Sequence, residues 1–129
     1  AALATIKKYI SEDVASQIIK TGNEVKSVWR KMAADNNLSI KITGLPSLAA
    51  FSFNHKKNQE IMTFFTIEML KKGFLGFRQF KPSMAHTSKD VVEYGLAVNE
   101  VFKKINRTDI DDLLKSPVAH SGLYRLTKE

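Results

Sequence analysis

The sequence contains no cysteine, only three prolines and six glycines, and no long apolar run. Without cysteine the chain has neither disulfide bonds nor thiolate chemistry. Its apolar stretches are far shorter than the roughly 20 residues of a transmembrane helix. Residues 1–10 lack the basic start, the longer apolar centre and the cleavage site of a secretory signal. These absences predict a cytoplasmic protein that does not bind membranes.

What is present is the composition of a single globular domain. The chain has 129 residues, of which 43% are hydrophobic and 26% charged, enough to bury a core without a disulfide or a metal. The net charge is +7, which raises the question of an anionic partner. The lysines are scattered in pairs near predicted helix ends, where they suit the helix dipole: Lys7-Lys8, Lys56-Lys57, Lys71-Lys72 and Lys103-Lys104. This distribution indicates solvated helix faces and no nucleic-acid partner.

Apolar side chains at spacings of three and four predict several helices. We expect them over residues 1–9, from Ser11 to about Ala34, over 57–72, from Thr87 to about Ile105, and over 108–114. Gly22 interrupts the second of these, which predicts a kink or close packing. Gly73 follows a basic last turn and predicts a left-handed helix end. Thr87 and Asp90 have the spacing of a capping box.

Three stretches have the character of strands. Residues 38–43 alternate apolar and polar side chains, residues 48–53 follow a turn at Gly44–Ser47, and residues 74–77 are short and aromatic. Arg78–Pro82 should be irregular because proline lacks the amide that a ladder needs. The order helix, strand, strand, helix, strand, helix predicts an α+β fold, a small antiparallel sheet of three or four strands with helices packed on it.

Residue patterns typical of catalysis are missing. His55, His86 and His120 are far apart and form no metal-binding pair, and no phosphate-binding glycine motif or serine nucleophile elbow occurs. His86 has two interpretations, a hydrogen-bonding residue at a helix terminus or a group facing a pocket or interface. The phenylalanines are interpreted as core: Phe51, Phe53, Phe64, Phe65 and Phe74. The residues alone predict a sound domain without an active site.

Several segments in order nevertheless match a known pattern. They are GLPSLAAFSF at 44–53, FFTIEMLKKG at 64–73, the stretch GFLGFRQFKPSMAHTSKDVVEYGLAVNEVFKKI at 73–105, and the tail SPVAHSGLYRL at 116–126. In order and spacing the whole chain resembles the C-terminal domain of class III pyridoxal-phosphate (PLP) dependent aminotransferases. The similarity is strongest to the branch of glutamate-1-semialdehyde 2,1-aminomutase. It implies the C-terminal small domain of a fold-type I PLP enzyme.

The resemblance implies that residues 1–129 are one domain at the C-terminal end of a larger enzyme, with residues 1–10 ending a helix that links it to a larger PLP-binding domain. An uncapped, alanine-rich start at Ala1 is also more natural inside a longer protein. In the family the Schiff-base lysine and the phosphate-binding loop lie in that upstream domain, so no catalytic, cofactor-binding or metal-binding residue is assigned here. The parent is expected to be a homodimer that carries PLP and moves an amino group between small amino and keto substrates, while the fragment alone is inactive.

By the same resemblance, the loop from Arg78 to Ser83 reaches the substrate cleft. Arg78 is the first candidate for holding a substrate carboxylate, because its guanidinium can bind both oxygens. Gln79, Phe80 and Lys81 are further substrate-binding candidates, while Ser83, His86 and Thr87 are expected to serve structure. The aminomutases have P-S-x-(F/Y)-E in this region, and the glutamate is missing here, so aminotransferase and aminomutase activities both stay open. The alternative function is a non-enzymatic binding module whose basic surface binds an anionic partner.

Overall fold

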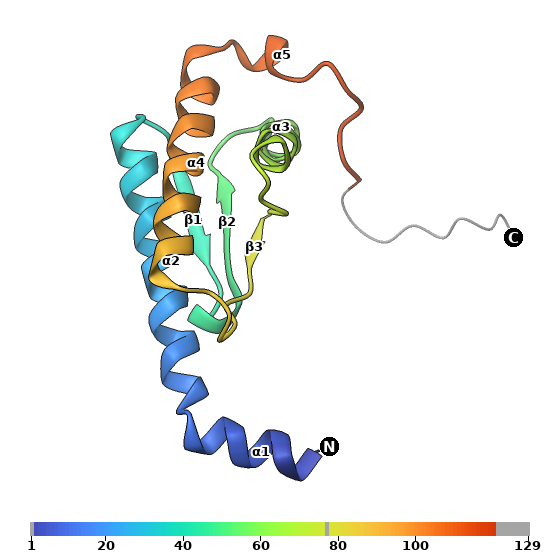
Figure 1. Ribbon diagram of the computed structural model, residues 1–129. Coiled ribbons are helices and arrows are strands. Elements are labelled where there is room, and N and C mark those ends of the chain that lie inside the picture. Colours follow the sequence, from blue (N-terminus) through green and yellow to red (C-terminus); the bar gives the residue numbers. More distant parts are fainter. Residues whose placement is uncertain (1, 77, 121–129) are drawn as a thin grey trace, which may run out of the picture.

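The computed structural model describes residues 2–76 and 78–120, in which helices pack against a small antiparallel sheet (Figure 1). The helices are α1 (Ala2–Ser11), α2 (Val14–Asp35), α3 (Asn58–Lys71), α4 (Ser88–Arg107) and α5 (Ile110–Leu113). The strands are β1 (Ile40–Thr43), β2 (Ala49–Phe53) and β3 (Gln79–Phe80), with a single 3-10 turn, η1 (Pro46–Leu48), before β2. The predicted α+β fold is confirmed.

The sheet has the order β1-β2-β3, and both pairings are antiparallel. Ile40 of β1 lies opposite Phe53, at one end of β2, and Phe80 of β3 lies opposite Ala49, at the other end. Every second residue of β2 is buried, starting from Ala49, so one face of the sheet meets the helices. Figure 1 shows α2 and α4 side by side along the sheet, with α1 projecting away from them. The two ends of β2 therefore belong to different parts of the surface.

Aromatic rings fill the space between the sheet and the helices. Phe51 of β2 is at the centre, with its ring centroid 4.8 Å from Trp29 of α2 and 5.2 Å from Phe65 of α3. Phe102 of α4 lies 6.0 Å from the same ring. All four side chains are fully buried, and tilted or edge-on ring pairs at such distances are favourable. The interpretation of Phe51, Phe53 and Phe65 as core is confirmed, and Phe64 and Phe74 are partly buried against it.

Gly22 marks a close approach between α2 and η1. A Cβ atom built on Gly22 would lie 1.9 Å from the carbonyl oxygen of Pro46, far inside any permitted contact. Helix α2 runs through this position without interruption. Of the two expectations for Gly22, the structure therefore shows close packing, and only a residue without a side chain fits there.

Two predicted helix termini are confirmed. The hydroxyl of Thr87 accepts a hydrogen bond from the amide of Asp90 at 3.3 Å, and the Asp90 carboxylate accepts one from the Thr87 amide at 2.7 Å. This reciprocal pair is the capping box at the start of α4. At the end of α3, Gly73 has a φ of 85°, and the amide of Phe74 donates to the carbonyl of Met69 at 3.0 Å, as in a Schellman-type end.

The predicted start of the second helix at Ser11 is wrong. Ser11 is the last residue of α1, and its hydroxyl donates back to the carbonyl of Lys8 at 3.2 Å. The break falls at Asp13, which is in the left-handed region with a φ of 46° and makes no side-chain cap. A serine hydroxyl can bond to a preceding carbonyl or to a following amide. A serine at this position is therefore compatible with the end of one helix as well as with the start of the next.

The predicted strand over 74–77 is also wrong, and Phe77 itself lies outside the described residues. The strand forms instead at Gln79–Phe80, inside the stretch that was expected to be irregular. Phe74 turns its ring to Tyr94, at 5.7 Å between centroids, and the amide of Gly76 donates to the carbonyl of Phe74 in a tight turn. Because Phe74 packs against Tyr94 of α4, it does not pair with β2 as a strand residue.

Candidate functional site

The loop between α3 and α4 passes β3 and places the predicted substrate-binding residues on one side of the fold. Pairing of β3 with the Ala49 end of β2 fixes Gln79 and Phe80. Lys81 follows and is exposed, and Pro82 is buried and ends the ladder. The capping box at Thr87 then turns the chain into α4. Strand pairing and helix cap together give this loop a defined shape.

A pocket of about 520 Å³ opens between this loop and the first turns of α4. Its size is within the usual range for small-molecule sites. Its apolar lining comes from Phe74, Leu75, Phe80, Val91 and Tyr94. Its polar lining comes from Gln79, Lys81, His86 and Asp90. Three of the four predicted substrate-binding residues, Gln79, Phe80 and Lys81, are thus brought together, and we call this space the β3–α4 pocket.

His86 satisfies both interpretations that the sequence left open. Its Nδ1 accepts a hydrogen bond from the Ser83 amide at 2.9 Å and lies 3.0 Å from the Ser83 hydroxyl. Its ring packs on Phe80, with centroids 5.1 Å apart, and lines the pocket. Because a backbone amide is always a donor, Nδ1 must be the acceptor and the neutral ring carries its proton on Nε2. His86 therefore offers a hydrogen-bond donor as well as shaping the loop.

Asp90 and Tyr94 line the pocket, and sequence analysis did not select either as a site residue. The hydrogen bonds from the Thr87 hydroxyl and amide hold the pKa of Asp90 below its ordinary value, with help from His86 and Lys89. Burial raises the pKa of Tyr94, against a smaller opposite effect of Trp29, whose Nε1 donates to the Tyr94 oxygen at 2.9 Å. Asp90 is therefore a carboxylate and Tyr94 a neutral phenol. The two residues are four apart in the sequence, a spacing that puts them on the same face of a helix. This spacing is the signal by which sequence analysis could have paired them.

Arg78 is directed elsewhere. Its Nη2 donates to the Oε1 of Gln59 on α3 at 3.2 Å, and its carbonyl accepts from the Phe51 amide at 3.0 Å. The amide nitrogen of Gln59 in turn donates to the carbonyl of Ala119 at 2.9 Å. Arg78 is half-buried and is not among the residues that line the β3–α4 pocket. The structure separates it from Gln79, Phe80 and Lys81.

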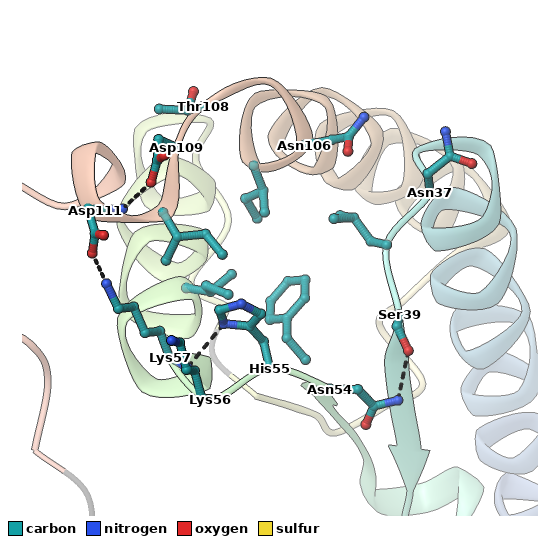
Figure 2. Close-up of a pocket in the computed structure, with 15 residues that line it drawn as sticks. Asn37, Ser39, Asn54, His55, Lys56, Lys57, Asn106, Thr108, Asp109 and Asp111 are labelled. Atoms are coloured by element: carbon teal, nitrogen blue, oxygen red, sulfur yellow. Dashed lines mark hydrogen bonds and ion pairs between the residues drawn. The ribbon is translucent and has the colours of Figure 1, made fainter.

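A second pocket, of about 540 Å³, lies at the other end of β2 (Figure 2). Its residues come from the end of the β1–β2 hairpin, the start of α3 and the turn between α4 and α5, and none of them belonged to the predicted site. In the described part of the chain, both pockets included, no group of three or more His, Cys, Asp or Glu residues is placed to hold a metal ion. No helix of residues 2–76 and 78–120 has the length and apolar character to cross a membrane.

Comparisons with known proteins support the fold. The sequence matches no protein-family model and no curated protein. Among solved structures, the chain is similar to the FumI protein of Sphingopyxis sp. MTA144 in its PLP internal aldimine form, with a TM-score of 0.79 and 22% sequence identity. The fold is that of a domain of a PLP-bound protein. The match covers 88% of this chain but only 28% of the FumI chain, so the chain corresponds to about a quarter of that protein.

Proposed function

We propose that this chain is the C-terminal domain of a class III PLP-dependent aminotransferase or aminomutase, which moves an amino group on a carboxylate-bearing substrate. The similarity in fold to a PLP-bound protein carries the proposal. The ordered sequence segments between Gly44 and Ile105 support it independently, since they resemble the same group of enzymes. In this proposal the remaining three quarters of the enzyme lie upstream, α1 leads toward them, and the intact enzyme is a cytoplasmic homodimer.

The described residues by themselves do not fit a PLP site. A lysine that forms a Schiff base is generally desolvated, whereas each lysine among the described residues is exposed or half-buried. Several of them already pair with carboxylates, including Lys57 with Asp111 and Lys72 with Glu100. We therefore assign no lysine of this chain to the cofactor, whose chemistry would be supplied by the upstream domain.

The contribution of this chain would be one wall of the substrate cleft. In the β3–α4 pocket, the ammonium of Lys81 and the Nε2–H of His86 are donors suited to a substrate carboxylate. Phe80 and Tyr94 supply an apolar floor that excludes water, and Gln79 adds an amide at the rim. The predicted role of Arg78 in carboxylate binding stays a prediction, since its guanidinium bonds to Gln59.

The alternative, a binding module with a basic surface, has no specific support from the structure. Seven lysines of the described part pair with carboxylates: Lys8, Lys31, Lys57, Lys71, Lys72, Lys89 and Lys104. A spectrum separates the two functions. The product of the complete gene should show the visible absorbance of lysine-bound pyridoxal and lose it on borohydride reduction. A product that purifies without this absorbance, even after incubation with PLP, would contradict the proposed PLP-dependent function.

Steady-state kinetics of the complete product tests the substrate wall. Lys81→Ala should raise the KM for carboxylate substrates about tenfold, as expected for the loss of one charged hydrogen bond, with little change in kcat. Lys103→Ala, at an exposed position on α4, is the matched control and should change neither constant. Arg78→Ala is also expected to raise KM. An unchanged KM in Lys81→Ala refutes the role of Lys81, and an unchanged KM in Arg78→Ala refutes the predicted role of Arg78 in carboxylate binding.

A further inference from the structure

The pocket of Figure 2 is separate from the proposed substrate wall. It lies at the Phe53 end of β2, whereas the β3–α4 pocket adjoins the Ala49 end, where β3 pairs. Its inner wall is part of the hydrophobic core, because Phe53, Ile61 and Ile105 are all at least 95% buried. Leu38 and Ile110 complete the apolar lining. Leu38 and Ile110 are half-buried, so they offer a ligand the accessible apolar surface, with the core residues behind them.

The imidazole of His55 has a fixed hydrogen-bonding role in this pocket. Its Nδ1 accepts a hydrogen bond from the Lys57 amide at 3.1 Å. The neutral ring must then carry its proton on Nε2, because the amide can only donate. His55 is exposed, and Figure 2 shows its ring beside the apolar side chains, with its second nitrogen turned away from that bond. His55 thus presents a donor at the mouth of the pocket.

The charged groups at the rim differ in how they are engaged. The ammonium of Lys57 pairs with the Asp111 carboxylate, which ties the start of α3 to α5. The carboxylate of Asp109 accepts from the Asp111 amide at 3.0 Å and caps α5. Lys56, next to His55, is exposed and makes no ion pair with any residue that the structure describes. The rim therefore pairs or caps its carboxylates and leaves a cation beside the His55 donor.

We infer that this pocket binds a small monocarboxylate with an apolar body, such as an aryl-substituted short-chain acid. The apolar body lies against Leu38 and Ile110, and the carboxylate accepts hydrogen bonds from His55 Nε2 and the Lys56 ammonium. A volume of about 540 Å³ admits a ligand of this size. None of its lining residues belongs to the β3–α4 pocket, so this binding is independent of the proposed catalysis.

Titration of the ¹⁵N-labelled chain with phenylacetate, followed by NMR, tests the inference. Saturable shifts are expected at the amides of Asn54, His55 and Ile110, which surround the pocket. Phenylethylamine is the matched probe, with the same ring and a cation in place of the carboxylate, and it should bind at least about tenfold more weakly. Binding of phenylacetate weaker than about 10 mM, or equal binding of the amine, would overturn the inference.

Variants place the ligand within the pocket. His55→Asn keeps an acceptor for the Lys57 amide while removing the Nε2 donor, and Lys56→Gln removes the charge. Each should weaken phenylacetate binding about tenfold. Lys41→Gln, on an exposed position of β1 outside the pocket, is the control and should bind like the parent. Thermal unfolding of each variant checks that the fold is kept, and unchanged affinity in both His55→Asn and Lys56→Gln would refute the assigned site.

Discussion

Replacing Gly22 by alanine is expected to destabilise the protein although alanine is the better helix former. In the middle of a helix the exchange stabilises by about 1 kcal/mol through propensity. Here, however, the new methyl group would lie 1.9 Å from the Pro46 carbonyl oxygen, and 2.5 Å from the carbonyl carbon. Both contacts are to backbone, so η1 must move away from α2. Overpacking costs about 1–3 kcal/mol or more, and a clash with backbone puts the cost near the upper value of about 3 kcal/mol, so after the gain of about 1 kcal/mol in helix propensity we expect a net loss of about 2 kcal/mol.

Urea unfolding followed by circular dichroism measures this loss in the free energy of unfolding directly. In thermal unfolding, the melting temperature should fall by about 8 °C. Gly95→Ala on α4 is the matched control within a helix. Its Cβ would meet the Val28 side chain, with Cγ1 at 3.2 Å and Cγ2 at 3.6 Å, and side-chain methyl groups yield more easily than backbone, so stability should change by less than about 1 kcal/mol. A Gly22→Ala variant as stable as the parent, or more stable, would refute the close approach of α2 and η1.

Three further predictions concern polar contacts. Burial alone would raise the pKa of Glu68, but the hydrogen bonds and charges of Lys104 and Lys71 together outweigh burial and hold this pKa below its ordinary value. The ionised Glu68 therefore contributes stability above about pH 4.5, and this contribution is lost as the pH falls through the folded-state pKa. Glu68→Gln should cost about 1 kcal/mol at pH 7 by urea unfolding, since both lysines are screened by solvent, and a difference that does not shrink as the pH is lowered below 4.5 would contradict this. Thr87→Ala should cost about 1 kcal/mol by removing the cap of α4, with Thr87→Ser close to the parent, and equal losses in both variants would show that the hydroxyl is not responsible. Trp29→Phe should cost about 1–2 kcal/mol because it removes the indole N–H that donates to the Tyr94 phenol oxygen. A double-mutant cycle with Tyr94→Phe should give a coupling energy of at least about 0.5 kcal/mol, and additive losses would show that the hydrogen bond does not contribute to stability.

Sequence periodicity and helix-end chemistry predicted most of the fold. The apolar face of α4 and its capping box depend on residues within one or two turns of each other, and so they could be identified locally. The same holds for Gly73, whose φ of 85° follows from the need to end α3. The antiparallel pairing of β1 and β2 was predictable because a short connection, residues 44–48, joins two alternating stretches.

The elements that sequence did not predict depend on distant partners. The break falls at Asp13, which has a positive φ; aspartate adopts this region more often than most residues but still uncommonly, so its presence alone did not mark the break. The place of β3 depends on pairing with Ala49, some 30 residues earlier. The bond from Arg78 to Gln59 joins residues 19 apart, and it moved the first site candidate away from the pocket that Gln79, Phe80 and Lys81 line.

The central claim, that this chain is one domain of a larger PLP enzyme, is tested most directly by locating the cofactor lysine. The product of the complete gene is reduced with borohydride, digested and analysed by mass spectrometry for a pyridoxyl-modified lysine. The account predicts a single modified lysine, on a peptide that lies upstream of the 129 residues described by this sequence. A modified lysine within these residues, or a product that takes up no pyridoxal at all, would contradict it.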